Sequence, residues 1–242
     1  MNVDIKIPYN TRPSMTRRTG PAFNANADLQ KIQLKNYELQ QHSDMLWGTA
    51  QGAEPLIRRA ARHCGKPETD DIVELALCFQ EDFAIMHRGN LAAVCFCFPS
   101  GWVPKHKLGL SLADIHRPVA DGQDLVRMSN RLANTMADVS LGGFKRSVWT
   151  VTASPNLNCM PGAYHVDEPR SLEDLYFRWE DQTTEPLNDG FSSLFFVDVQ
   201  VVPLLSVWEQ LGSSIVQSVN SMTDAVLNYK NLSKIKIILN AN

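Results

Sequence analysis

The sequence is poor in the cysteine patterns that mark common metal centres. Its five cysteines are Cys64, Cys78, Cys95, Cys97 and Cys159, and no two of them form a Cys-x-x-Cys pair. This absence argues against a zinc ribbon, an iron–sulfur cluster and a covalently attached c-type haem. Because the number is odd and the neighbouring residues are apolar, we expect reduced thiols and a cytoplasmic protein rather than a secreted disulfide framework.

Long apolar runs and a strong charge excess are also missing. No run approaches the length of a membrane span, so no membrane association is expected. The arginines Arg12, Arg17 and Arg18 are not followed by the apolar segment of a secretory signal. The formal net charge of -3 weighs against a generic nucleic-acid binder, which usually has a basic domain. With 44% hydrophobic and 20% charged residues, the chain of 242 residues can form a packed core.

The order of periodic patterns predicts the organisation of the chain. We expect residues 1–26 to form an irregular arm and residues 27–242 to form a single domain. Helices are predicted over residues 27–47, from Pro55 onward, over PETDDIVELALC with Thr69 or Asp70 as its N-cap, and over residues 121–136 and 206–229.

Two hairpins and one further strand are predicted alongside these helices. Apolar runs on both sides of His87-Arg88-Gly89-Asn90 predict a hairpin with a type II′ turn. SVWTVTA, LYFRWEDQTT and SSLFFVDVQVV predict three more strands, the last two joined through Leu187-Asn188-Asp189-Gly190. Segregated helices on a mainly antiparallel sheet of about five strands make an α+β fold. A PAS-like domain, in which a curved sheet and its helices enclose a ligand, has this arrangement.

The segment FPSGWVPKHKLGLSLADIHRPV, residues 98–119, follows an apolar strand and cannot continue it, because proline interrupts the ladder. It contains Trp102, and its apolar residues anchor it against a core. His116 follows this apolar part and precedes Arg117-Pro118, so one ring nitrogen can be held toward a fixed point. The alternative is a core histidine bonded to a backbone carbonyl. His165, in a loop, is the second candidate ligand.

Polar side chains alternate along the strand predicted at residues 175–184. Arg178, Glu180 and Gln182 share one face by the two-residue period, and Asp198 lies on the partner strand. Because aromatic residues flank this row, it can line a polar ligand pocket. The alternative is a solvent-exposed sheet face with a cross-strand salt bridge.

Several motifs resemble those of the haem-dependent oxidative N-demethylase family. They are Gln80-Glu81-Asp82-Phe83, FPSGW, KLG, IHRPV, the Arg178-x-Glu180-x-Gln182 element, Val202-Pro203-Leu204 and Tyr229-Lys230. The resemblance extends from about residue 71 to residue 230. The series FPSxW…KLG…IHxPV is its most specific part, because it fixes many residue types at set spacings.

The resemblance implies a PAS-like fold that holds haem b. It implies an oxidoreductase, a monooxygenase whose iron activates O2 and oxidises the N-methyl group of a small amine substrate with release of formaldehyde. Electrons are expected from a separate reductase with a flavin and an iron–sulfur centre, because this chain has no motif for either. His116 is the expected iron ligand. Further expected haem contacts are Arg117, Arg178, Trp102 and His165, and the expected polar groups toward substrate or O2 are Glu180 and Gln182.

The chain also departs from the family pattern at arginine positions. Asp181 and Asp198 replace arginines, and residues 150–153 replace an Arg-x-Asn-Trp element. The lost arginines favour an alternative function, a non-catalytic PAS-like module that binds or senses haem or another small ligand. A second alternative is an accessory subunit with an empty pocket.

Overall fold

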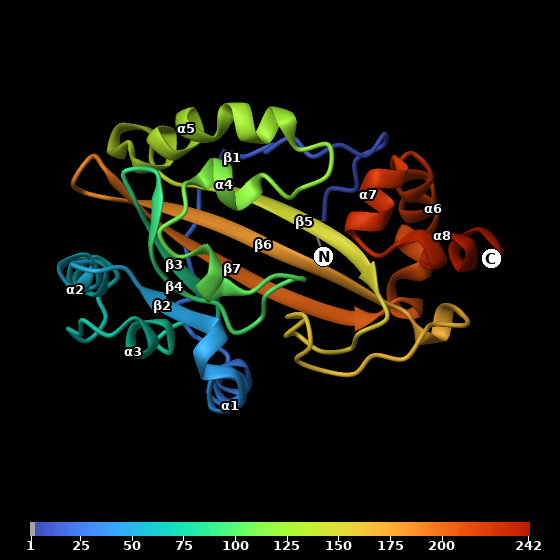
Figure 1. Cartoon of the computed structure of the whole chain (residues 1–242), viewed down its shortest axis with the longest axis horizontal. Coiled ribbons are helices and arrows are strands. Elements are labelled where there is room, and N and C mark those ends of the chain that lie inside the picture. The colour runs from blue at the N-terminus through green and yellow to red at the C-terminus, as the bar shows by residue number, and fades with distance from the viewer. Residues whose placement is uncertain (1–2) are drawn as a thin grey trace.

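The computed structural model describes residues 3–242 and shows an antiparallel sheet with helices around it (Figure 1). Over these residues the sheet has seven strands in the order β1-β5-β6-β7-β3-β4-β2. Their bounds are β1 (Thr16–Arg17), β2 (Trp47–Thr49), β3 (Asp82–His87), β4 (Asn90–Cys95), β5 (Phe144–Thr152), β6 (Tyr176–Leu187) and β7 (Ser192–Pro203). The α+β class is confirmed. The predicted strands are β3 to β7, and the short β1 and β2 extend a sheet that remains compatible with a PAS-like fold.

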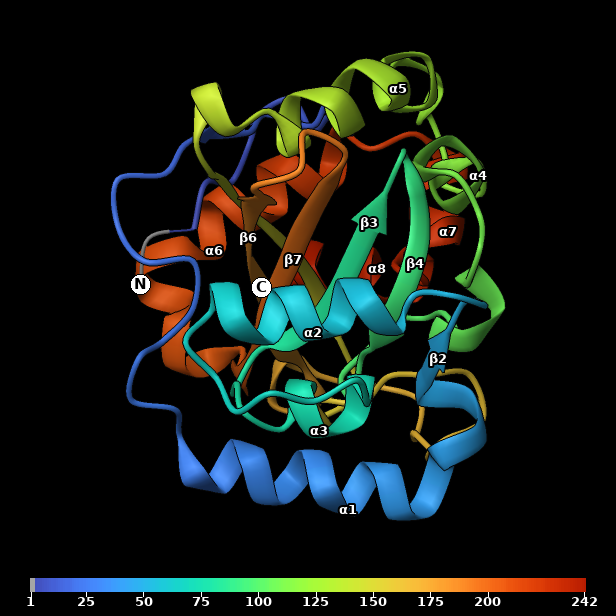
Figure 2. The same cartoon turned by 90° about the vertical axis from the view of Figure 1, so that its left-hand side faces the viewer.

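The helices cover both faces and one end of this sheet. In the described part of the chain they are α1 (Leu29–Leu46), α2 (Glu54–His63), α3 (Ile72–Ala76), α4 (Leu112–His116), α5 (Gln123–Ala137), α6 (Leu205–Asn220), α7 (Asp224–Tyr229) and α8 (Ser233–Asn240). Figures 1 and 2 show α4 and α5 on one side of the sheet, α1 to α3 on the other, and α6 to α8 at one end. Among residues 3–242, none of the helices combines the length and the apolar character needed to cross a bilayer.

The register of β5, β6 and β7 decides which side chains share a face. Arg146, Gln182 and Val197 lie in one row across the three strands. We call this side the α4 face, and alternation places Arg178 and Glu180 on it as well. Asp198 pairs with Asp181 and contacts Lys31 of α1, so this pair lies on the opposite side, the α1 face. The common face predicted for Arg178, Glu180 and Gln182 is therefore present.

Helix α1 turns charged residues toward the protein. Lys35 is fully buried and donates to the carbonyl oxygens of Ala76, Phe79 and Glu81 at 2.6, 2.9 and 2.6 Å. Three hydrogen bonds from one ammonium offset much of the cost of burying its charge. Leu29, at the start of the same helix, is 75% exposed. The pattern of apolar residues located this helix but did not identify its buried side.

Two local predictions are wrong in detail. The turn between β3 and β4 has Arg88 and Gly89 at its centre, with φ angles of 50° and 79°. Positive φ at both positions is the pattern of a type I′ turn, not of type II′. The N-cap of α3 is Asp71, whose carboxylate accepts hydrogen bonds from two backbone amides of the first turn, rather than Thr69 or Asp70.

The helix predicted over residues 206–229 is divided in the structure. Helix α6 ends at Asn220, and Thr223 caps the separate helix α7 through its hydroxyl. Helices α4 and α8 were not predicted. The five residues of α4 are too few for periodicity to reveal, and Ser111 caps it by accepting from the Asp114 amide.

Two hydrophobic clusters hold the sheet. One surrounds Phe79, Phe83 and Phe196, whose ring centroids are 5.1 to 5.3 Å apart, beneath β3, β4 and β7. The other joins Trp149 and Phe177 to α6, α7 and α8. The named aromatic residues of β3, β5, β6 and β7 lie on the side opposite the α4 face, which carries the polar side chains described next.

Candidate functional site

His116 is the last residue of α4 and is half-buried beside the sheet. Its Nδ1 lies 2.8 Å from the carbonyl oxygen of Leu112. A carbonyl can only accept, so Nδ1 carries the hydrogen and Nε2 keeps its lone pair. Burial, and in smaller part the positive charge of Arg146, lowers the pKa of His116 to about 4. The imidazole is therefore neutral at neutral pH, and no described residue forms a hydrogen bond with Nε2.

The structure separates the other candidate histidine from this position. His165 is exposed and approaches Asp167 at 3.2 Å, with both side chains almost fully in solvent. It lies in the loop between β5 and β6, where the neighbouring Tyr164 donates to Glu38 of α1 at 2.8 Å. His106, in the 3-10 helix η1 (Pro104–Lys107), is also exposed. Of these three histidines, His116 is the one whose pKa is affected by Arg146 of the α4 face.

A continuous chain of hydrogen bonds crosses the α4 face. Arg178 Nε donates to Ser100 Oγ at 2.8 Å, and the Ser100 hydroxyl donates to Glu180. Gln182 Nε2 donates to Glu180 at 2.7 Å, while Gln182 Oε1 accepts from Arg146 Nε at 2.6 Å. Charge-assisted bonds of this kind hold side chains in one arrangement. The predicted residues Glu180 and Gln182 are thus brought together, and Arg146 is added to them.

Arg178 and Arg117 have different surroundings. Arg178 is 2% exposed and donates to the carbonyl oxygens of Phe98 and Leu157, both at 2.8 Å. It ties the end of β4 and the β5–β6 loop to β6. Arg117 lies on the surface in an ion pair with Asp114. The structure thus buries Arg178 among backbone acceptors and leaves Arg117 in solvent.

Aromatic side chains form an apolar border of the α4 face. Trp102 packs edge-on against Phe96, with centroids 5.3 Å apart. Phe96 stacks on Phe195 at 6.3 Å. Phe96 is buried, and Phe195 and Trp102 are half-buried. A flat aromatic ligand could contact this border on one side and the polar chain on the other.

The sequence analysis gave no role at the site to three of its residues, although Lys230 belongs to a motif of the family resemblance. Arg146 of β5 is held by Gln182 and by the carbonyl oxygen of Pro13 at 3.4 Å. Lys230, just after α7, donates to the carbonyl oxygen of Trp149 at 3.1 Å, and its Nζ lies 5.7 Å from the Tyr9 ring centroid. Alternation along β5 could have placed Arg146 opposite Gln182. Nothing local could have brought Tyr9 or Lys230 to this position.

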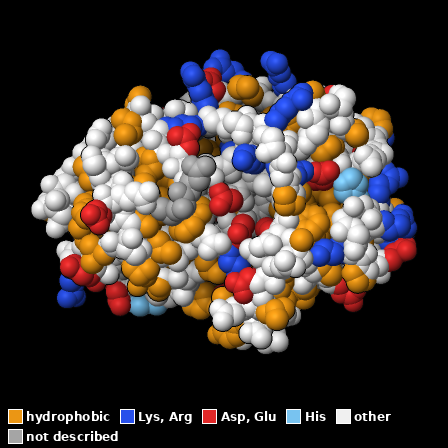
Figure 3. All heavy atoms as spheres, turned by 180° about the vertical axis from the view of Figure 1, so that it is seen from behind, with side chains coloured by type: hydrophobic (Ala, Val, Ile, Leu, Met, Phe, Trp, Pro, Cys, Tyr) orange, Lys and Arg blue, Asp and Glu red, His pale blue; other side chains and the backbone are white. Residues whose placement is uncertain are grey.

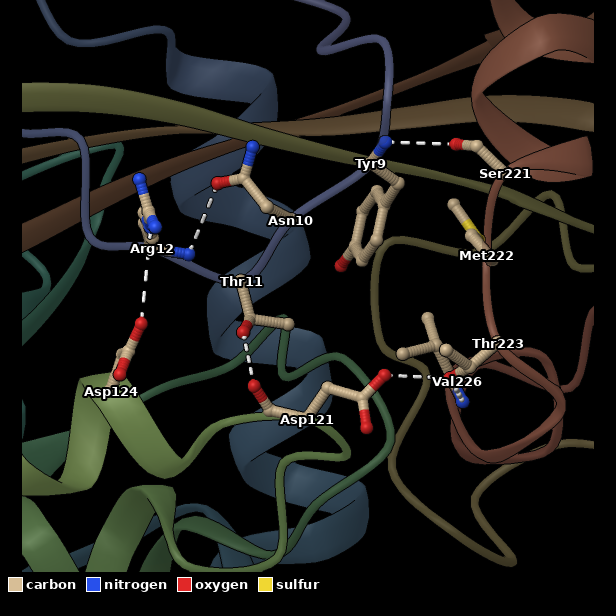
Figure 4. Close-up of a pocket in the computed structure, with 10 residues that line it drawn as sticks. All are labelled: Tyr9, Asn10, Thr11, Arg12, Asp121, Asp124, Ser221, Met222, Thr223 and Val226. Carbon is tan, nitrogen blue, oxygen red and sulfur yellow. Dashed lines mark hydrogen bonds and ion pairs between the residues drawn. The ribbon is translucent and has the colours of Figure 1, made fainter.

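The N-terminal arm covers one side of the site. Tyr9 N donates to Ser221 Oγ at 2.8 Å, and Thr11 Oγ1 donates to the Asp121 carbonyl oxygen at 2.7 Å. These contacts border a pocket of about 250 Å³ between the arm, the α4–α5 connection and the start of α7 (Figure 4). Seen from behind, acidic and basic side chains gather around a hollow in the middle of the surface (Figure 3). The pocket is below the roughly 300–1,000 Å³ of ordinary ligand sites, and its lining includes Tyr9 but not His116, Glu180 or Gln182.

Side chains of the usual metal-binding types are not clustered. Within residues 3–242, no group of three or more His, Cys, Asp and Glu residues could hold a metal ion. A single histidine suffices only where the ligand itself supplies the remaining metal bonds, as a porphyrin does.

Comparison with known families gives one match. The chain matches the model of the family described as "Haem-dependent oxidative N-demethylase, alpha subunit-like" over residues 29–239. The matched range contains α4, the α4 face and Lys230, and it begins after the N-terminal arm. No curated protein matches the chain.

Proposed function

This chain belongs to the haem-dependent oxidative N-demethylase, alpha subunit-like family, and from that membership we propose that it binds a b-type haem through His116. In this proposal the holoprotein is a cytoplasmic monooxygenase that removes an N-methyl group from a small amine. O2 is the oxidant, and a separate reductase with a flavin and an iron–sulfur centre supplies the electrons. The haem is not covalently attached, because the sequence has no Cys-x-x-Cys-His.

The donor set of His116 is the observation that supports this proposal. Histidines that ligate metals usually donate their other ring N–H to a carbonyl or a carboxylate, which fixes the tautomer and the ring orientation. His116 has this arrangement with Leu112, and its Nε2 is unprotonated. The aromatic border of Trp102 and Phe96 adds the apolar contacts that a porphyrin needs. These residues fit a haem with one protein ligand.

Each residue of the site has a defined task in this proposal. The haem, when bound, supplies O2 activation and oxidation of the N-methyl group. His116 holds the iron, and the Leu112 carbonyl holds His116. Glu180 and Gln182 fix each other and present polar groups toward the ligand space. The arm, through Tyr9, limits access of water from one side.

Two of the positions where the family pattern has arginine lie away from this site, so their replacement removes no cation from it. Asp181 and Asp198 lie opposite each other on the α1 face. Asp198 forms an ion pair with Lys31, and Asp181 accepts from Ser147. Haem held by His116 would lie on the other side of the sheet. These two replacements therefore leave the α4 face and its cations in place.

A non-catalytic haem or small-ligand module is the second candidate function. It is favoured by the bonding of Glu180, whose two oxygens accept from Ser100 and Gln182. A carboxylate engaged in this way is less available to a substrate. In this alternative the site binds its ligand and no turnover follows.

Reconstitution followed by turnover separates these functions. We expect the purified chain to take up about one equivalent of hemin with a Soret band, because one His116 site is present per chain. With a surrogate reductase, NADH and a series of N-methylated amines, release of formaldehyde identifies the enzyme. Haem uptake without formaldehyde supports the binding module, and failure to take up hemin contradicts both the enzyme and a haem-binding module.

A further inference from the structure

Two cations near the α4 face have no carboxylate partner among residues 3–242. Arg146 forms hydrogen bonds only with an amide oxygen and a backbone carbonyl, those of Gln182 and Pro13. Lys230 donates only to the carbonyl oxygen of Trp149. Both side chains are half-buried, and each contacts the arm, Arg146 at the Pro13 carbonyl and Lys230 at the Tyr9 ring. The other lysine and arginine side chains of the sheet core, by contrast, have carbonyl cages or carboxylates close by.

Burial acts on the pKa of both cations. Burial lowers the pKa of Arg146, and Glu180 and Tyr9 only partly offset this effect. Burial also lowers the pKa of Lys230 to about 8, again with partial compensation from Glu180. Tyr9 remains protonated, because burial raises its pKa to about 12. Glu180 is thus the shared carboxylate for both cations, yet it forms an ion pair with neither.

A charge count around the face gives an excess of cations. In the described structure Arg146, Arg178 and Lys230 stand against Glu180 and Asp82. Asp82 forms an ion pair with none of them; its oxygens accept from the Cys97 and Phe98 amides. A buried charge without a partner is costly, and buried ions are normally paired. The arrangement is therefore incomplete without an anion.

The spacing of the two cations indicates the size of that anion. Arg146 and the Trp149 carbonyl that holds Lys230 are three residues apart on β5, which is roughly 10 Å along a strand. The two cations are therefore held at separate points along β5 and have no hydrogen-bond partner in common. A ligand with two separated carboxylates can contact both.

We propose that Arg146 and Lys230 bind the carboxylates of one large dianionic ligand, which in the haem-bound protein are the two propionates. This inference rests on the proposed function, because it assumes that haem is the ligand held by His116. It places the propionate edge of the haem toward β5 and the N-terminal arm, and the opposite edge toward Trp102 and Phe195.

Comparing the affinities for hemin and for its dimethyl ester tests this role directly, because esterification removes the charge of both carboxylates and leaves the macrocycle unchanged. Affinities are measured by Soret titration for the unmodified chain, Arg146→Met, Lys230→Met and the double variant. We expect each single variant to weaken hemin binding by about 10- to 100-fold, as loss of a charge-assisted bond does. Binding of the dimethyl ester should be the same in all four proteins. Lys145→Met is the matched control, because Lys145 is the exposed neighbour of Arg146 on β5, and it should bind hemin normally.

Stability of the haem-free proteins is a second readout. If Arg146 and Lys230 had a purely structural role, their replacement would lower the urea midpoint of the apoprotein. Removing a buried cation without a partner should leave the urea midpoint of the apoprotein unchanged or raise it. An equal loss of affinity for hemin and for its ester in the variants would overturn the inference, and so would unchanged hemin affinity in the double variant. A chain that takes up hemin but prefers the ester would also contradict it. No hemin uptake by the unmodified chain would instead mean that the proposed function itself fails, and the inference with it.

Discussion

Nδ1 of His116 lies 2.8 Å from the carbonyl oxygen of Leu112, one helical turn earlier in α4. Both interpretations of His116, as a core histidine and as an iron ligand, expect this bond. The other nitrogen distinguishes them. A core histidine would have both nitrogens bonded within the protein, whereas Nε2 of His116 has no partner among the described residues and is not one of their buried unpaired polar atoms, so it is accessible from outside. The bond to Leu112 therefore orients a nitrogen that is still free to bind.

The first prediction concerns stability against pH. The pKa of His116 is lowered to about 4 in the folded chain, against an ordinary value of 6.5. Between these values the unfolded chain binds more protons, so the folded apoprotein loses stability as the pH falls. We expect the apoprotein to lose about 2 kcal/mol relative to His116→Leu between about pH 7 and about pH 5. Urea unfolding of both proteins at the two pH values measures this difference.

Comparison with the variant is necessary because Asp82 titrates in the same range with the opposite sign. Burial raises the pKa of Asp82 to about 6, so its carboxyl group favours the folded state at lower pH. Both proteins contain Asp82, and its contribution cancels in the difference. An equal response of the two proteins to pH would show that His116 is not buried in its neutral form.

The second prediction separates stability from ligand binding at Arg178. Arg178→Leu leaves the carbonyl oxygens of Phe98 and Leu157 without their charged donor. We expect a loss of about 3–5 kcal/mol in the free energy of unfolding, measured by chemical denaturation. Arg117→Leu is the control, because it breaks an exposed ion pair worth less than about 1 kcal/mol. Should Arg178→Leu keep its stability but lose hemin affinity, Arg178 would be a ligand contact as the family resemblance implies.

The third prediction concerns the arm as a cover. A chain without residues 1–12 lacks the bonds from Tyr9 to Ser221 and from Thr11 to Asp121. Haem bound behind this segment should dissociate faster, by about tenfold or more, while its Soret position stays the same because His116 is retained. Transfer of haem to an excess of another haem-binding protein gives the rate. Arg12→Ala removes only an exposed ion pair with Asp124 and should leave the rate unchanged, and an unchanged rate in the truncated chain would mean that the arm does not cover the haem.

Strands and hairpins were predictable because their signals are local. Alternation along β6 predicted that Arg178, Glu180 and Gln182 lie on one side, and the regular pairing of β6 with β5 and β7 preserves this alternation. The turn type was wrong because Arg88 adopts a positive φ that is unusual for arginine. Turn position follows from sequence more reliably than turn geometry does.

The site itself was only partly predictable because its contacts are long-range. Arg146 was overlooked because alternation along β5 shows which residues share a face, but it does not show whether that face belongs to the site. Tyr9 and Lys230 are separated by most of the chain and meet only because the arm and α7 pack on the same side. Lys35 shows the same limit in the core, where backbone carbonyls from the end of α3 and the segment after it compensate a charge that local pattern would place in solvent.

Replacement of His116 by glycine tests the central claim most directly. We expect His116→Gly to lose most of its hemin or to show a shifted Soret band, and added imidazole to restore the band by entering the space left by the side chain. His106→Gly and His165→Gly, at exposed positions, are the controls and should bind hemin as the unmodified chain does. An unchanged Soret band and unchanged haem retention in His116→Gly would contradict the account, because another residue would then hold the iron.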